Sequence, residues 1–156
     1  GYGRRAFDHG LGRSIWFSTG ANVERIVATI STFPETRQAD LWGGIGLACA
    51  YAAGVVDRDA IGALRSAAGP HGPAMVAGAA VAATFRMQTG GVAAHTDLAC
   101  EVLCGLSSEI VAHIADFARY NLPPDGAEPA YEIWRQRLAD QFATEAKSEP
   151  VRKEMR

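Results

Sequence analysis

Aromatic side chains are scarce in this sequence, and its charges nearly cancel. Aromatic residues make up 8% of the 156 residues, whereas hydrophobic residues as a whole make up 48%. Alanine dominates this hydrophobic fraction, which favours closely packed helices over a β-sandwich. The formal net charge of −2 provides no basic surface. We therefore expect an α-helical domain with no nucleic-acid partner.

Signals of secretion and of membrane insertion are also missing. The sequence begins Gly-Tyr-Gly-Arg-Arg, without Met and without an apolar signal region. The uncharged run 41–56 is shorter than the roughly 20 residues of a membrane-spanning helix. The three cysteines (Cys49, Cys100 and Cys104) are an odd number in apolar contexts, which indicates reduced thiols rather than a disulfide framework. We expect a cytoplasmic protein without a membrane span, of which this chain is the later part.

The uncharged stretch that follows Asp40 has a counterpart on each side, 34 residues away. The equivalent positions are Gly10, Gly44 and Gly78; Gly12, Gly46 and Ala80; Phe17, Tyr51 and Phe85; Gly20, Gly54 and Gln88; and Ile30, Leu64 and Leu98. Such a period is typical of stacked helical hairpins. Glycine allows two helices to approach closely, so we expect Gly46 at a helix crossing. The sequence predicts an all-α fold, an irregular stack of helical hairpins with a period of about 34 residues.

Local signals divide the chain further. The expected helix N-caps are Asn22, Asp57, Thr96 and Ser107, and the expected stops include Gly20 and Gly105. After Ser107, one apolar helix face is expected from Ile110, Val111, Ile114 and Phe117. We predict a helical-hairpin repeat region over 1–122, a linker over 123–128, a terminal helix over 129–146 packed on the same domain, and a flexible tail over 147–156.

His9 and Arg13 are the first candidate catalytic residues. They lie four residues apart, on one face of the first expected helix. One interpretation is an anion-binding or acid–base site. The other is a solvated helix face, with Asp8 near the positive N-terminal end.

The cysteines raise the possibility of a metal or a nucleophile. Cys100 and Cys104 are one helical turn apart, but no Cys-x-x-Cys or His-x3-His pair accompanies them. We therefore expect buried structural thiols, no metal and no cofactor. A catalytic pair of His95 and Cys100 is the alternative, because five residues across a helix start allow the two side chains to meet.

Trp16, Trp42 and Arg86 are candidate ligand-binding residues. The two tryptophans lie in small-residue surroundings, where they either fill the core or form the walls of a ligand groove. Arg86 interrupts an apolar helix face. It either extends to solvent or is buried with a carboxylate partner, for which Glu101 is the expected residue.

Four segments resemble a bacterial family of unknown function. They are Arg-Arg-Ala-Phe-Asp-His-Gly-Leu-Gly-Arg-Ser-Ile-Trp-Phe at 4–17, Ala-Asp-Leu-Trp-Gly-Gly-Ile-Gly-Leu-Ala at 39–48, His-Thr-Asp-Leu-Ala-Cys-Glu-Val-Leu-Cys-Gly-Leu-Ser at 95–107, and Tyr-Glu-Ile-Trp-Arg at 131–135. Members of that family are often encoded beside the iterative polyketide synthase of enediyne clusters. The resemblance covers about residues 1–143 and implies the C-terminal half of a longer protein. Asp97 stands where relatives are expected to have Glu.

The resemblance implies an accessory protein of enediyne or polyketide natural-product biosynthesis. Its expected partner is a polyketide synthase or another pathway protein, or else an apolar polyene. One alternative is an enzyme that acts on the polyene through His9, Arg13, His95 or Cys100. The other alternative is a purely structural helical repeat protein.

Overall fold

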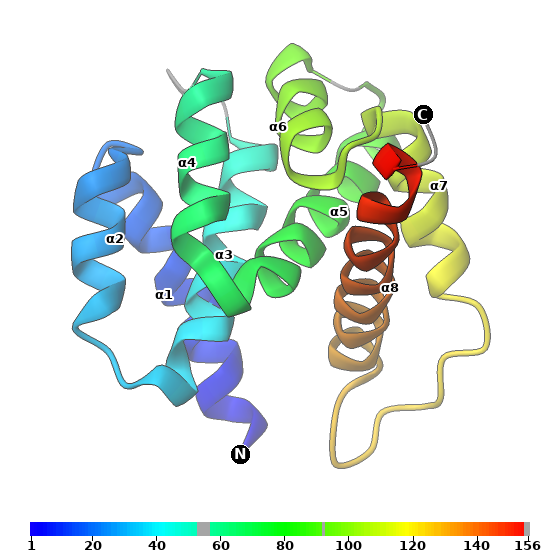
Figure 1. The fold of residues 1–156 in the computed structure, drawn as a ribbon. Helices are drawn as coiled ribbons and strands as arrows, with labels where there is room; N and C mark the ends of the chain where they lie inside the picture. The colour runs from blue at the N-terminus through cyan, green and yellow to red at the C-terminus, as the bar shows by residue number, and fades with distance from the viewer. Residues whose placement is uncertain (53–56, 92, 155–156) are drawn as a thin grey trace.

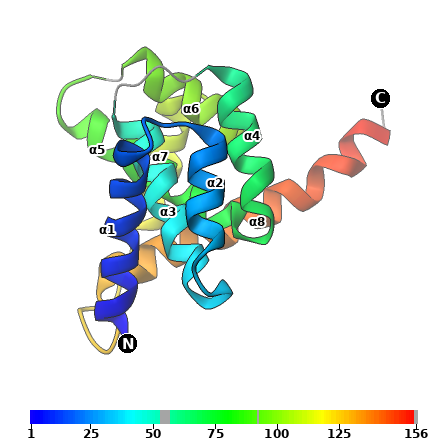
Figure 2. The ribbon, with the colours of Figure 1, turned by 90° about the vertical axis from the view of Figure 1, so that its left-hand side faces the viewer.

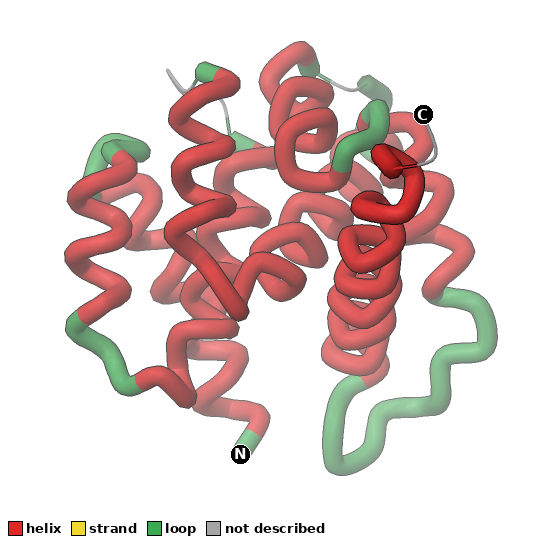
Figure 3. Tube along the Cα trace, in the orientation of Figure 1, coloured by secondary structure: helices red, strands yellow, loops and turns green. Residues whose placement is uncertain are grey.

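A computed structural model describes residues 1–52, 57–91 and 93–154, and within these ranges the regular structure is entirely helical (Figure 3). The helices are α1 (Tyr2–Ser18), α2 (Val23–Ser31), α3 (Glu35–Tyr51), α4 (Arg58–Ala68), the short 3-10 helix η1 (Gly69–His71), α5 (Gly72–Gln88), α6 (Ala94–Cys104), α7 (Ser108–Ala118) and α8 (Ala130–Glu154). The all-α prediction is confirmed.

Helices α3 and α5 form the centre of the molecule. Figure 1 shows α1 and α2 on one side of this pair and α7 and α8 on the other, and Figure 2 shows the C-terminal part of α8 extending away from the other helices. All residues of 40–50 in α3 and 75–84 in α5 are buried. A helix that is covered on every side must be apolar or small on every side. This explains why these two helices carry so many Gly and Ala residues.

Glycines allow the backbones of α1, α3 and α5 to touch. A Cβ atom built on any of four glycines would lie 1.9–2.2 Å from a carbonyl oxygen of the facing helix. The four approaches are Gly12 to Leu41, Gly44 to His9, Gly46 to Met75, and Gly78 to Gly43. Side chains larger than hydrogen have no room at these positions. The expected placement of Gly46 at a close crossing is therefore correct.

The two crossings use the same pattern of residues. Each glycine contact between α3 and α5 lies 34 positions after a contact between α1 and α3, in both partners. Phe17, Tyr51 and Phe85 lie on the last turns of α1, α3 and α5. Phe17 is 60% exposed, whereas the other two are half-buried. Gly54 lies outside the described residues. The repeat of whole hairpins stays a prediction.

Three of the four expected helix caps are present. The side chains of Asn22, Asp57 and Ser107 accept hydrogen bonds from backbone N–H groups three residues later, at 3.0, 2.8 and 3.3 Å. The cap at Thr96 is wrong, because α6 already begins at Ala94. The buried Thr96 hydroxyl instead donates to the carbonyl oxygen of Ala50 at 2.7 Å. A tertiary contact has replaced the local one.

The apolar face expected on α7 is divided between core and solvent. Val111 is fully buried, whereas Ile110 is 49% and Phe117 80% exposed. The small residues Ala112 and Ala115 complete the buried face of α7. The helix can approach the core closely along this small-residue face, which turns Phe117 outward.

Within the described ranges, no single helix has the length and apolar character to cross a membrane, although α6 and α7 taken together do, with a bend of 69° between them. The division into repeat region, linker, terminal helix and tail stays a prediction.

Replacing Gly46 by Ala should destabilise the protein by about 1–3 kcal/mol, because the new Cβ would meet the carbonyl oxygen of Met75 at 1.9 Å. The matched control is Gly10→Ala, also in a helix interior, where a Cβ meets nothing within 4 Å. That variant should be as stable as the original or up to about 1 kcal/mol more stable. Denaturant unfolding measures both, and equal stability of the two variants would contradict the close crossing.

Candidate functional site

A pocket opens where the last turns of α3 and α5 meet the middle of α1 and the first turn of α8. Its volume is about 430 Å³. The lining residues are His9, Arg13, Leu47, Tyr51, Phe85, Gln88, Thr89 and Tyr131. Two sequence candidates, His9 and Arg13, therefore lie together in one cavity. We refer to this cavity as the aromatic pocket.

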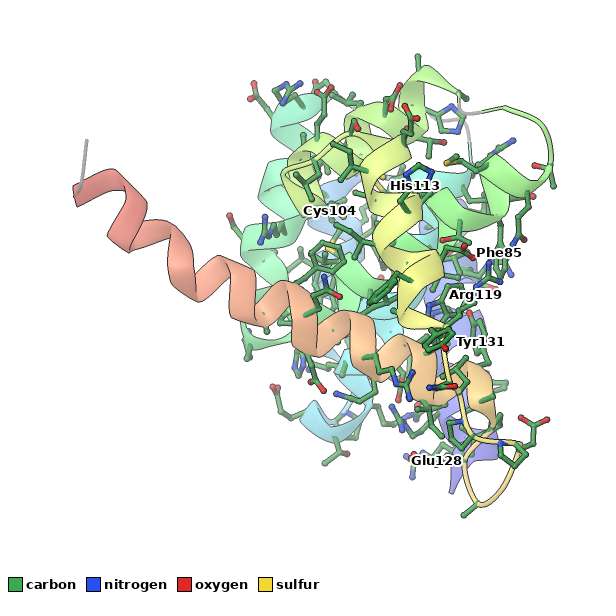
Figure 4. All side chains as sticks on the ribbon, turned by 90° about the vertical axis from the view of Figure 1, so that its right-hand side faces the viewer. Phe85, Cys104, His113, Arg119, Glu128 and Tyr131 are labelled. Carbon is green, nitrogen blue, oxygen red and sulfur yellow. The ribbon has the colours of Figure 1, made fainter. Side chains whose placement is uncertain are left out.

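Trp134 of α8 holds two of the pocket rings. Its ring meets those of Phe85 and Tyr131 edge to face, with centroids 6.2 and 6.0 Å away. Arg119 lies 5.0 Å from the Trp134 centroid, and the indole N–H donates to the Ala115 carbonyl at 2.8 Å. Figure 4 shows Phe85, Arg119 and Tyr131 on the same side of the molecule. Two walls of the pocket are thus fixed by a buried side chain behind them.

Tyr51, the third aromatic wall, is held at the C-terminal end of α3. Arg86 donates two hydrogen bonds to its carbonyl oxygen, one from Nε at 3.1 Å and one from Nη2. The same guanidinium lies 4.3 Å from the centroid of the tyrosine ring. His95 Nε2 is 3.2 Å from the same oxygen and must donate, because a carbonyl only accepts. These contacts satisfy an otherwise unpaired carbonyl at a helix end.

The expected pairing of Arg86 with Glu101 is wrong. Glu101 instead binds Arg58 at 2.7 Å on the surface. Arg86 extends toward the end of α3 rather than toward α6, and its hydrogen bonds go to a backbone carbonyl. Its positive charge therefore has no carboxylate partner among the described residues.

His9 is buried beside the pocket in a neutral form. It is 8% exposed, and its Nε2 has no hydrogen-bond partner among the described atoms. Gly43 leaves the space in which Arg135 and the imidazole come together. Burial, followed by the positive charges of Arg135 and Arg13, lowers the pKa of His9 to about 3. The imidazole is therefore uncharged at neutral pH.

The interpretation of a solvated helix face around His9 is wrong. Asp8 is only 1% exposed and forms an ion pair with Arg37, with an Nη2–Oδ1 distance of 2.6 Å. The hydrogen bond from Arg37 holds the pKa of Asp8 below its usual value, although burial opposes that shift.

A buried ion-pair cluster joins α1, α3 and α8 behind His9. Its members are Arg5, Asp40, Glu132 and Arg135. Arg135 lies 2.9 Å from Glu132 and 3.5 Å from Asp40, and Arg5 bridges the same two carboxylates, at 3.2 Å from Asp40. Asp40, Glu132 and Arg135 are each less than 8% exposed. Because Glu132 follows Tyr131 directly, the cluster also fixes the first turn of α8 at the pocket.

The remaining candidates lie in the core. Trp16 and Trp42 are each 2% exposed and pack among apolar residues. Cys100 is fully buried, next to Cys49, whose pKa is raised to about 12 by burial and by Cys100. Within the described part of the chain, no group of three or more His, Cys, Asp and Glu side chains is arranged to hold a metal ion.

Four lining residues are absent from the sequence candidates: Leu47, Gln88, Thr89 and Tyr131. Tyr51 and Phe85 were identified only as members of the 34-residue pattern. Their shared spacing places both at the ends of neighbouring central helices, where a pocket can form. Tyr131 opens the last of the four segments that resemble the bacterial family, which is the signal that points to it.

Two other cavities are lined by charged or acidic residues. One, of about 410 Å³, includes Arg5, Asp8, Arg37 and Asp40, which already pair with one another. Another, of about 510 Å³, includes Asp97 and Glu109. The aromatic pocket differs from both because none of its lining residues is acidic.

Stability should fall on acidification between about pH 6.5 and pH 4 because of His9. The unfolded imidazole takes up a proton near pH 6.5, whereas the native one does so only near pH 3. Unfolding then binds up to one extra proton, which lowers the free energy of unfolding by up to about 1.4 kcal/mol per pH unit. His9→Gln should remove this slope, and the control His113→Gln, at an exposed histidine, should retain it. Urea unfolding at several pH values measures both, and an unchanged slope in His9→Gln would contradict the buried neutral imidazole.

Cys49 and Cys100 should react slowly with iodoacetamide at neutral pH, because both are buried and Cys49 also has a raised pKa. The native protein should bind no stoichiometric zinc. Mass spectrometry of peptides after a short labelling pulse measures each thiol separately, with the urea-unfolded protein as the fully reactive control. Rapid labelling of Cys100 that is slowed by His95→Ala would instead establish a Cys–His pair.

Comparison with known proteins identifies a family but no activity. The family model described as "Protein of unknown function (DUF1702)" matches residues 1–142. No curated protein and no solved structure matches the chain. The expected membership of a family of unknown function is confirmed, while the link to enediyne clusters stays a proposal.

Proposed function

The chain belongs to the DUF1702 family of proteins of unknown function, and we propose that it binds an elongated apolar molecule, such as a polyketide-derived polyene, in the aromatic pocket. The observation that carries the proposal is the pocket itself. Three aromatic side chains and Leu47 line it, and none of its lining residues is acidic.

The dimensions and the construction of the pocket support small-molecule binding. Its volume of about 430 Å³ falls in the range of about 300–1,000 Å³ that is usual for ligand sites. Phe85 and Tyr131 are supported from behind by Trp134, and Tyr51 is clamped by Arg86 and His95. Rings that are already fixed lose little freedom when a flat conjugated molecule stacks on them.

The biosynthetic context rests on the sequence resemblance. An accessory protein of enediyne or polyketide assembly would take an apolar polyene from the polyketide synthase or another pathway protein. Rigid aromatic walls suit a conjugated chain better than a polar intermediate, because the chain is flat and has no hydrogen-bonding groups of its own.

The second candidate function is an enzyme acting on the same polyene, and His9 is the observation that favours it. A neutral imidazole beside an apolar cavity can accept a proton from a substrate. Nε2 is buried without a partner, so the ring meets the pocket through its other atoms. A turnover-dependent change in the polyene absorption spectrum, lost in His9→Gln, distinguishes an enzyme from a binding protein. The purely structural role remains for a protein that binds no such molecule.

The methyl ester of cis-parinaric acid tests the binding proposal, because this uncharged conjugated tetraene fluoresces strongly only in apolar surroundings. We expect saturable binding at one molecule per chain. Tyr131→Ala should weaken it about tenfold or more, because the ester loses one aromatic wall. The matched control is Phe117→Ala, at an aromatic residue that is 80% exposed and does not line the pocket.

Thermal unfolding of both alanine variants shows whether either has lost its fold. If Tyr131→Ala does not fold, Thr89→Trp replaces it, because Thr89 is an exposed lining residue where a bulky ring would obstruct the pocket. Absence of saturable binding, or equal binding by the obstructed and original proteins, would overturn the proposal.

A further inference from the structure

We propose that the ligand of the aromatic pocket carries a carboxylate and that Arg13 binds it. This inference rests on the proposed function and specifies the chemistry of the ligand. It is carried by the distribution of charge around the pocket, where positive side chains lack carboxylate partners and none of the lining residues is acidic.

Arg13 differs from the other arginines near this end of α1. Arg5 and Arg135 pair with buried carboxylates, and Arg37 pairs with Asp8. Arg13 lines the pocket, is exposed, and forms no ion pair with any described residue. Its guanidinium is therefore free to form a bidentate contact with an incoming carboxylate.

The other lining groups leave this positive charge uncompensated. The imidazole of His9 is neutral, and burial raises the pKa of the Tyr131 phenol, so that it stays protonated. Arg86 adds a second positive charge behind the ring of Tyr51, because its hydrogen bonds go to a backbone carbonyl. Each charge favours an anion at the edge of an otherwise apolar cavity.

The arrangement predicts the orientation of the ligand. Arg13 is exposed while Leu47 is buried, so the charged group lies at the opening and the apolar chain lies inside. A charge left near solvent requires less desolvation than a buried one. An apolar chain with a terminal carboxylate fits this division of the pocket.

Comparison of cis-parinaric acid with its methyl ester tests the inference at pH 7.5, where the acid is ionised. We expect the acid to bind at least about threefold more tightly than the ester, a modest factor because Arg13 is exposed. Arg13→Gln should remove this preference by weakening the acid alone. The matched control Arg25→Gln, at an exposed arginine on α2 that does not line the pocket, should retain the preference.

Raising the salt concentration should reduce the preference of the original protein for the acid, because ions screen an exposed pair. Equal affinity for acid and ester would overturn the carboxylate inference while leaving the binding proposal intact. An acid preference that persists in Arg13→Gln would overturn the assignment to Arg13. Failure of the ester and the acid to bind at all would overturn the proposed function, and this inference with it.

Discussion

The close backbone contact of α3 with α1 and α5 is the constraint on which the structure depends. A Cβ atom at Gly12, Gly44, Gly46 or Gly78 would collide with a carbonyl oxygen of the next helix. Each glycine inside a helix costs about 1 kcal/mol relative to alanine, which the dispersion contacts of two touching helices offset. The contact buries all of 40–50 in α3 and brings the last turns of α3 and α5 beside the middle of α1. The aromatic pocket forms at this meeting point.

The buried ion pairs set the position of the last wall. Arg135 and Glu132 of α8 pair with each other, and both contact residues of α1 or α3. A buried pair contributes little net stability over an apolar substitute, but loss of one partner typically costs about 3–5 kcal/mol. The cluster therefore specifies where α8 docks more than how strongly. Its positive member also lies against His9 and keeps that imidazole neutral, which links the position of the helix to the charge of the site.

The sequence predicts what depends on neighbouring residues and fails where distant elements meet. Asn22, Asp57 and Ser107 cap helices through contacts three residues away, and the glycine spacing identifies the crossing residues before any fold is known. Thr96 has the same local signal, yet its hydroxyl bonds to Ala50 on another helix. Arg86 likewise binds the end of α3 instead of Glu101. His9 and Arg13 were found as candidates because they share a helix face, whereas Tyr131 reaches the pocket only through the docking of α8.

A crystal structure of the protein with cis-parinaric acid tests the central claim most directly. We predict that the tetraene lies in the aromatic pocket against Tyr51, Phe85 and Tyr131, with its carboxylate within hydrogen-bonding distance of Arg13. The same molecule bound only at another surface, or an empty aromatic pocket at saturating concentration, would contradict the account.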